Sequence, residues 1–254
     1  MKNTLVKIDT STYLFFLLAM MAGYIKSTII IFVIILLHEM GHVISTYLCG
    51  YKVLSVTLYP FGGYTIIDKK INTSINKDIL IALSGVFMQL LIFLFINVFS
   101  SFFISSTYNL INSYNKIILL FNLLPIIPLD GFKVVNLLFN KFFSFKSSYF
   151  ISFFVGLIFY FLFTIYIFNM KMNNTIILIF LGFNILKYIK DYKYIYNRFL
   201  LERYLGSFDY KRIINNSVDI GDLRLESLHF FKNNNKYNHE KNILAKRFDI
   251  KWYF

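Results

Sequence analysis

The sequence has few charged residues and very few acidic ones along most of its length. Only 15% of its 254 residues are Asp, Glu, Lys or Arg, whereas a soluble domain carries about 25%. Between positions 10 and 67 the sole acidic residue is Glu39, and between positions 79 and 190 it is Asp130. This composition argues against a soluble protein. It predicts a transmembrane core over residues 1–190, followed by a basic cytoplasmic tail over 191–254.

Cysteine is also nearly absent. The single Cys49 excludes an intramolecular disulfide and a metal site built from several thiolates. Positive charge is abundant instead: the formal net charge is +13, and 14 of the 26 Lys and Arg residues fall between positions 187 and 251. No nucleic-acid motif surrounds them, so we expect no nucleic-acid partner. Basic segments beside a membrane are expected on electrostatic grounds, and the lipid bilayer is the predicted partner.

Long apolar stretches fill the first three quarters of the chain, which is 57% hydrophobic overall. A membrane-spanning helix needs about 20 apolar residues. The pattern predicts an all-α polytopic membrane protein with about six transmembrane helices, at 10–25, 27–48, 78–104, 107–128, 148–168 and 173–190. Lys and Arg gather in alternate connecting segments, and by the positive-inside rule this places both termini in the cytoplasm.

Proline occurs at only three positions, and each marks an interruption. Pro60 lies in an apolar turn sequence, LYPFGGY at 58–64, which predicts a short hairpin. It is more apolar than an ordinary solvated loop, so we expect a hairpin loop that dips into the membrane edge. A simple surface turn is the alternative interpretation.

The second predicted span contains the pattern HEMGH at 38–42. Residues four apart share one face of a helix, so His38 and His42 can bind one metal ion. Glu39 is offset by one position and is placed to act as a general base toward a water molecule at the metal. The alternative is a proton relay, or polar contacts that hold helices together.

A catalytic zinc site normally has three protein ligands. Asp130 is the remaining carboxylate in the predicted spans or at their ends, and Pro125, Pro128 and Gly131 interrupt the helix around it. The expected topology brings the ends of the second and fourth spans to the same cytoplasmic depth. Asp130 is therefore the predicted third ligand of one Zn²⁺ per chain, and an ordinary residue at a helix end is the alternative.

Asn122 lies about two helical turns before Asp130, on the membrane side. An amide inside a bilayer needs a hydrogen-bond partner. Asn122 could orient a substrate carbonyl, donate to a developing oxyanion, or bind a neighbouring helix.

These motifs together resemble the site-2 protease family of intramembrane zinc metalloproteases, and within it the sporulation branch. The resemblance covers roughly residues 10 to 206. It rests on HEMGH at 38–42, PFGG at 60–63, NLLPIIPLDG at 122–131 and RFLLERY at 198–204.

The resemblance implies a multi-pass protein of the bacterial cell membrane, with zinc held by His38, His42 and Asp130. Glu39 would be the catalytic base, and Asn122 would be a catalytic residue that positions substrate. A membrane-dipping loop would contact substrate through Phe61, Gly62 and Gly63. The expected substrate is a membrane-associated protein, such as a sporulation sigma-factor precursor, and membrane-protein regulators are expected partners.

Two features depart from the family pattern. Val86 stands where the family often has proline, in SGV at 84–86. About 48 residues follow Gly206, too few for the complete nucleotide-binding CBS domain of the sporulation branch, so nucleotide regulation is not inferred.

Two other functions use the same residues. A metal or proton transporter could employ the ligands, but transporters tend to contain internal repeats, and each motif occurs once here. A non-catalytic membrane scaffold would not need Glu39. The sequence therefore favours hydrolysis of a peptide bond near the cytoplasmic face.

Overall fold

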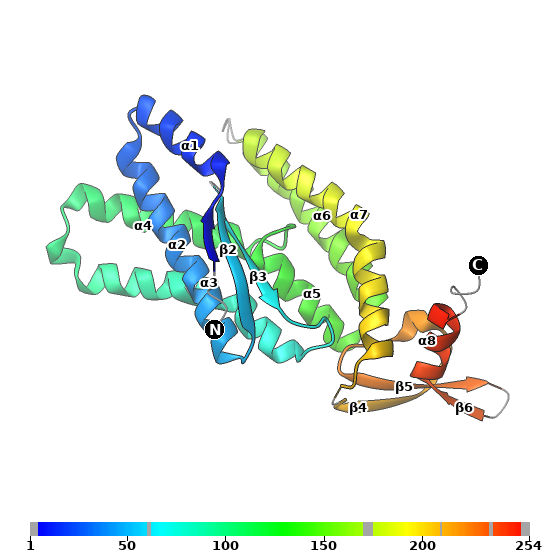
Figure 1. The fold of residues 1–254 in the computed structure, drawn as a ribbon. Helices are drawn as coiled ribbons and strands as arrows, with labels where there is room; N and C mark the ends of the chain where they lie inside the picture. The colour runs from blue at the N-terminus through cyan, green and yellow to red at the C-terminus, as the bar shows by residue number, and fades with distance from the viewer. Residues whose placement is uncertain (1–4, 60–61, 170–174, 209, 234–235, 250–254) are drawn as a thin grey trace. The chain divides into compact units, whose positions relative to one another are not determined.

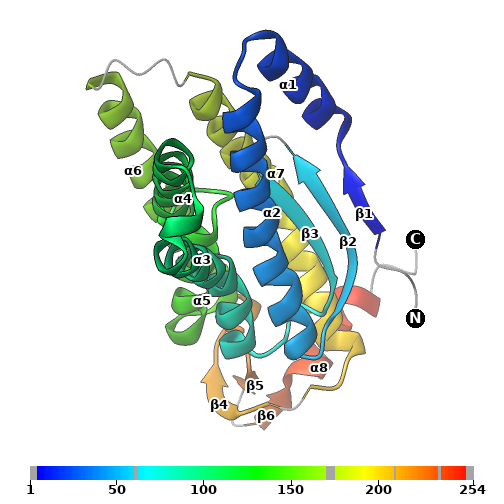
Figure 2. The ribbon, with the colours of Figure 1, turned by 90° about the vertical axis from the view of Figure 1, so that its left-hand side faces the viewer.

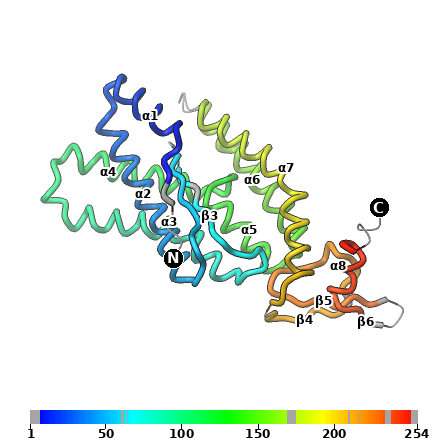
Figure 3. Tube along the Cα trace, in the orientation of Figure 1, coloured from blue at the N-terminus to red at the C-terminus, as the bar shows by residue number. Residues whose placement is uncertain are grey.

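The structure is a computed structural model that describes residues 5–59, 62–169, 175–208, 210–233 and 236–249. It is mostly helical, and Figures 1 and 3 trace the chain from the N-terminus to the C-terminus. The helices are α1 (Thr10–Met21), α2 (Ile25–Leu48), α3 (Ile75–Val98), α4 (Ser105–Leu123), α5 (Asp130–Phe142), α6 (Phe145–Asn169), α7 (Thr175–Leu205) and α8 (Glu240–Phe248). The strands are β1 (Leu5–Ile8), β2 (Lys52–Tyr59), β3 (Gly62–Asp68), β4 (Arg212–Ser217), β5 (Ser227–Asn233) and β6 (Lys236–His239), and two short 3₁₀ helices are η1 (Ser100–Phe102) and η2 (Ile220–Asp222).

The chain divides into two compact units. The first contains the residues up to Lys69 together with Leu80–Leu124, and the second contains Lys70–Ile79 together with the residues from Pro125 onward. Each unit contains a three-stranded sheet. The expectation of an all-α fold is therefore wrong in this respect, although the mostly helical character is confirmed.

The sheet of the first unit packs against α2. Its order is β1-β2-β3, with β1 parallel and β3 antiparallel to β2. Val53, Val56 and Leu58 of β2 are buried. The alternation of buried and exposed side chains along the strand shifts by one residue at the bulge between Val53 and Ser55. These side chains pack against Phe32, Leu36 and Val43, which lie on α2, and Figure 2 shows α2 running along the sheet. The predicted hairpin at 58–64 corresponds to the β2–β3 pair, and its tip, Pro60 and Phe61, lies outside the described residues.

Within the part of the chain that the structure describes, three helices are long and apolar enough to cross a membrane: Ile25–Leu48, Ile75–Val98 and Phe145–Phe168. In the most apolar 18-residue stretch of each helix, no more than 39% is buried by the rest of the chain. Apolar side chains left exposed over such lengths are stable in lipid and not in water. These three helices support an integral membrane protein.

Among the described residues, the other three predicted spans do not correspond to helices that are both long enough and apolar enough to cross a membrane. Helix α1 has only 12 residues, which is too short to cross a bilayer upright. Helices α4 and α7 cover much of 107–128 and 173–190, but neither meets the same combination of length and apolar composition. The count of six spans, the cytoplasmic position of both termini and the membrane-dipping loop stay predictions.

The fourth predicted span is too long at its C-terminal end. Helix α4 stops at Leu123, two residues before Pro125, and a new helix, α5, begins at Asp130. Proline lacks the amide hydrogen that a continuing helix would need. Asp130 therefore begins a helix, where the positive end of the helix dipole favours a carboxylate.

The C-terminal part of the second unit folds around a small sheet. Helix α7 continues through the expected boundary at residue 190 as far as Leu205, and the sheet that follows has the order β4-β5-β6. Phe199 and Leu200 of α7 share a buried cluster with Leu223, Phe231 and Leu244. Fully buried Arg203 of α7 also forms an ion pair of 2.5 Å with fully buried Glu240 of α8.

Candidate metal centre

Helix α2 places both histidines of the HEMGH pattern on one buried face. His38 and His42 are only 4% and 7% exposed. Their Nε2 atoms lie 3.2 Å apart. Two nitrogen ligands bonded to one zinc ion at 2.0–2.1 Å and a tetrahedral angle are separated by about 3.3 Å. The two rings therefore already have the spacing that a shared zinc ion requires.

The orientation of His42 leaves its Nε2 available as a ligand. Its Nδ1 lies 2.7 Å from the carbonyl oxygen of Ile81, which lies on α3. A carbonyl can only accept, so Nδ1 carries the hydrogen and Nε2 carries the lone pair. Contacts of this kind fix the tautomer and orientation of metal-binding histidines.

Gly85 of α3 makes the close approach to both rings possible. A Cβ built on Gly85 would lie 2.4 Å from Cε1 of His38 and 2.5 Å from Nε2 of His42. Any larger residue would displace the imidazoles. The pattern SGV at 84–86 did not predict this role for Gly85. The available signal was a glycine inside an apolar helix, which often indicates close packing.

Glu39 is buried beside the histidines and is held by β3. Its Oε1 accepts a hydrogen bond from the backbone amide of Gly63 at 3.2 Å, and its Oε2 accepts one from Oγ1 of Thr65 at 3.3 Å. The backbone of Gly63 can approach this closely because a Cβ there would lie 2.4 Å from Cδ of Glu39. Glu39 is thus positioned by the sheet, as a general base next to the metal ligands would have to be.

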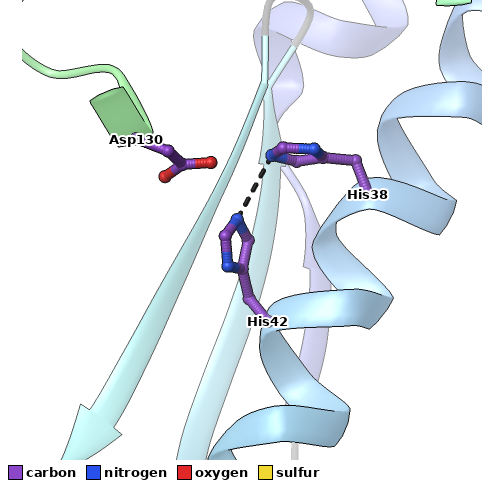
Figure 4. Close-up of side chains that lie close together, drawn as sticks. All are labelled: His38, His42 and Asp130. Carbon is purple, nitrogen blue, oxygen red and sulfur yellow. Dashed lines mark hydrogen bonds between the residues drawn. The ribbon is translucent and has the colours of Figure 1, made fainter. Parts of the chain in front are cut away.

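Asp130 supplies the third candidate ligand. Its carboxylate is buried and accepts a hydrogen bond from Nζ of Lys133 at 2.8 Å. His38, His42 and Asp130 each offer one donor atom, and these atoms lie within 4.8 Å of one another. Figure 4 shows the carboxylate facing the two imidazoles. Two imidazoles and a carboxylate form a usual donor set of catalytic zinc sites, so the chain has a buried group compatible with a single zinc ion.

The other predicted site residues differ in how far the structure describes them. Asn122 is half-buried in the last turn of α4, and its side chain forms no hydrogen bond with the residues that the structure describes. Gly62 and Gly63 begin β3, and Gly63 contacts Glu39. Phe61 lies outside the described residues. A substrate-contacting role for Asn122, Phe61, Gly62 and Gly63 stays a prediction.

Comparison with known families agrees with this geometry. Residues 26–108 match the family model described as Peptidase family M50. The matched segment contains His38, Glu39, His42 and Gly85. This part of the chain is similar to peptidase family M50.

Three relatives extend the comparison. The chain is 28% identical over 213 residues to Stage IV sporulation protein FB of Bacillus subtilis, an alignment covering 80% of this chain and 73% of the relative. It is 29% identical over 115 residues to a putative zinc metalloprotease of Synechocystis, covering 43% of this chain and 30% of the relative. It is 27% identical over 125 residues to a zinc metalloprotease of Methanocaldococcus jannaschii, covering 47% and 36%.

A solved structure shares the fold. The site-2 protease from Methanocaldococcus jannaschii matches with a TM-score of 0.55 and 22% sequence identity, covering 72% of this chain and 89% of that chain. The family match over residues 26–108 and the relatives' names support a metalloprotease. The zinc expected from the sequence agrees with these names and with the buried group of two histidines and one aspartate.

Proposed function

We propose that the chain is an intramembrane zinc metalloprotease that hydrolyses a peptide bond of a membrane-associated protein near the cytoplasmic face of a bacterial cell membrane. One observation carries this proposal. The Nε2 atoms of His38 and His42 lie 3.2 Å apart, and Glu39 of the same helical turn is held in place by a hydrogen bond from β3. A metal-binding scaffold or a transporter needs the histidines but not Glu39, so the position of Glu39 supports the enzyme.

His38, His42 and Asp130 would hold the zinc ion. When bound, zinc lowers the pKa of water and polarises a carbonyl group. Glu39 then takes the proton of the attacking water on a carboxylate oxygen and passes it to the leaving amine nitrogen. Gly63 and Thr65 keep that carboxylate in place through both transfers, because each donates a hydrogen bond to one of its oxygens.

The substrate must arrive as an extended segment, because a helix hides its carbonyls in its own hydrogen bonds. Strand β3 is an edge strand of the order β1-β2-β3, and the edge of a sheet can pair with an added strand. Pairing along β3 would bring the scissile bond beside Glu39, with Phe61, Gly62 and Gly63 close to the substrate. The Asn122 amide is proposed to donate to the substrate carbonyl, where charge develops.

Similarity to a sporulation protein suggests a sigma-factor precursor as the candidate substrate. The test is co-expression of the full chain with a membrane-associated precursor, comparing wild type with Glu39→Gln. We expect cleavage by wild type and none by Glu39→Gln, with equal amounts of zinc in both purified proteins. Asp191→Asn, which removes a carboxylate from α7 instead, is the control and should cleave normally. Cleavage by Glu39→Gln within a few-fold of wild type would contradict the mechanism.

A further inference from the structure

A cavity in the second unit suggests a second site, because the residues that line it take no part in the metal centre. The cavity has a volume of about 520 Å³. It lies among the first turn of α3, the last turn of α5, strand β4 and the segment that leads into β5. The polar residues that line it include Asn140, Lys141, Lys211, Arg212, Arg224 and Glu226.

The lining is strongly cationic. It contains four basic residues and one acidic residue. Glu226 is neutralised by Lys211, whose Nζ lies 2.6 Å from its Oε1. Lys141, Arg212 and Arg224 form no ion pair with any residue in the described ranges. The cavity therefore carries about three uncompensated positive charges, which attract a multiply charged or phosphate-bearing anion.

The position of the cavity along the chain is that of a membrane boundary. Ile75, one of its lining residues, is the first residue of the candidate span Ile75–Val98. Lys141 precedes the candidate span Phe145–Phe168 by four residues. Basic pockets at the ends of membrane helices lie at the level of lipid headgroups.

Apolar side chains complete the lining. Ile75 and Leu225 are buried, and Ile213 and Ile214 also line the cavity. A free inorganic anion gains nothing from these residues, because it has no apolar part to bury. A phospholipid offers both a phosphate group and the apolar carbons next to it.

We propose that this cavity binds the phosphate-bearing headgroup of an anionic phospholipid. Lys141, Arg212 and Arg224 contact the phosphate, and Ile213 and Ile214 contact the adjoining glycerol and acyl carbons. The site is independent of the proteolytic activity proposed above. Glu226, which lines the cavity, also accepts a hydrogen bond from the backbone amide of Ile75 at 3.1 Å. This contact holds the cavity wall against the first turn of α3, so the bound lipid lies beside that turn.

The test measures lipid bound to the purified, delipidated full chain in a neutral detergent, where no charged bilayer contributes. Native mass spectrometry compares phosphatidylglycerol with phosphatidylcholine for wild type and for the triple variant Lys141→Gln/Arg212→Gln/Arg224→Gln. Each exposed ion pair with the phosphate contributes about 1 kcal/mol, so we expect the triple variant to bind phosphatidylglycerol roughly 100-fold more weakly. The control is Lys187→Gln/Lys190→Gln/Lys193→Gln, which removes three exposed charges of α7 and should bind as wild type does.

Several results would overturn the proposal. Equal losses in both triple variants would show diffuse charge attraction, and equal binding of phosphatidylcholine would show that the phosphate charge is not recognised. Displacement of the lipid by millimolar inorganic phosphate would make a free phosphate the ligand. If the triple variant fails to fold, the three single variants are measured instead, and each should weaken binding about fivefold.

Discussion

The absence of a side chain on Gly85 is what allows α3 to lie against the imidazole of His38. A Cβ on Gly85 would be 2.4 Å from Cε1 of that ring, and atoms that close must move apart. Helix α3 also supplies the carbonyl of Ile81 that orients His42. The metal centre therefore depends on the packing of α3 as much as on the ligands themselves.

Gly85→Ala should lower both zinc content and proteolysis, because the added methyl group displaces both imidazoles. We expect activity to fall at least about 100-fold, as for other misplacements of about 1 Å at a catalytic site. Zinc per mole of purified protein is the direct measurement. Gly182→Ala in α7 is the matched control, since its Cβ would meet only the movable hydroxyl end of Tyr160 at 3.2 Å. Equal zinc in Gly85→Ala and wild type would contradict the steric argument.

Thr65→Val should reduce turnover without changing zinc content. The substitution keeps the shape of the side chain and removes its hydrogen bond to Oε2 of Glu39, while the Gly63 amide still holds Oε1. A hydrogen bond to a charged group is worth about 1.5–3 kcal/mol, so kcat should fall about 10- to 100-fold. Thr57→Val on β2, whose side chain forms no hydrogen bond within the described residues, should leave kcat unchanged. An equal effect of both variants would point to a general weakening of the sheet.

Asp130→Asn should lower zinc occupancy together with activity, since a neutral amide is a poor replacement for a charged oxygen ligand. Asn122→Ala should keep zinc and lose turnover, because Asn122 is proposed to contact substrate. Metal analysis of both purified variants, beside wild type and His38→Ala, distinguishes the two roles. The opposite pattern, with zinc lost from Asn122→Ala and retained in Asp130→Asn, would mean that the third ligand has been misassigned.

The small C-terminal sheet should lose stability in mild acid because of His229. Burial, reinforced by the charge of Arg203, lowers the pKa of His229 from 6.5 to about 4. Its Nε2 accepts a hydrogen bond from the amide of Arg224 at 3.0 Å, so the folded state requires the neutral ring. An unfolded chain takes up a proton near pH 6.5. Between pH 6.5 and about 4 the unfolded state therefore binds more protons, and stability falls as the pH falls through this window.

Hydrogen exchange of β5 amides, corrected for intrinsic exchange rates, measures this loss. Protection should be constant above pH 6.5 and should decrease toward pH 4. His229→Gln, which cannot titrate, should flatten the profile over the same range. An unchanged slope in this variant would assign the effect to other groups.

Membrane topology is a separate prediction from the Lys and Arg distribution. A reporter fused after Phe254 and one inserted near Asn72 should both be cytoplasmic, whereas one near Ser106 should be external. Reporter activity on each side of the membrane is the measurement. An external C-terminus would overturn both the six-span arrangement and the cytoplasmic position of the site.

The sequence by itself was enough to predict which residues form the candidate metal centre. The spacing of His38 and His42 fixes two ligands on one helical face whatever surrounds them, because the geometry of a helix is local. Asp130 could be chosen for a similar reason: an acidic residue is costly within apolar sequence, so its presence signals a function. The three long apolar helices could also be predicted from the sequence, since each is a continuous run of apolar residues.

Tertiary structure decided how these residues are held. Gly85 and Thr65 are separated from His38 and Glu39 by 47 and 26 positions, and no local pattern reports a contact over such distances. The β2–β3 hairpin was predicted from the sequence, but the parallel pairings of β1 with β2 and of β4 with β5 were missed for the same reason, because they join separated segments. The sequence also could not reveal that Arg203 and Glu240 are buried, since burying an ion pair is favourable only when folding brings both partners together.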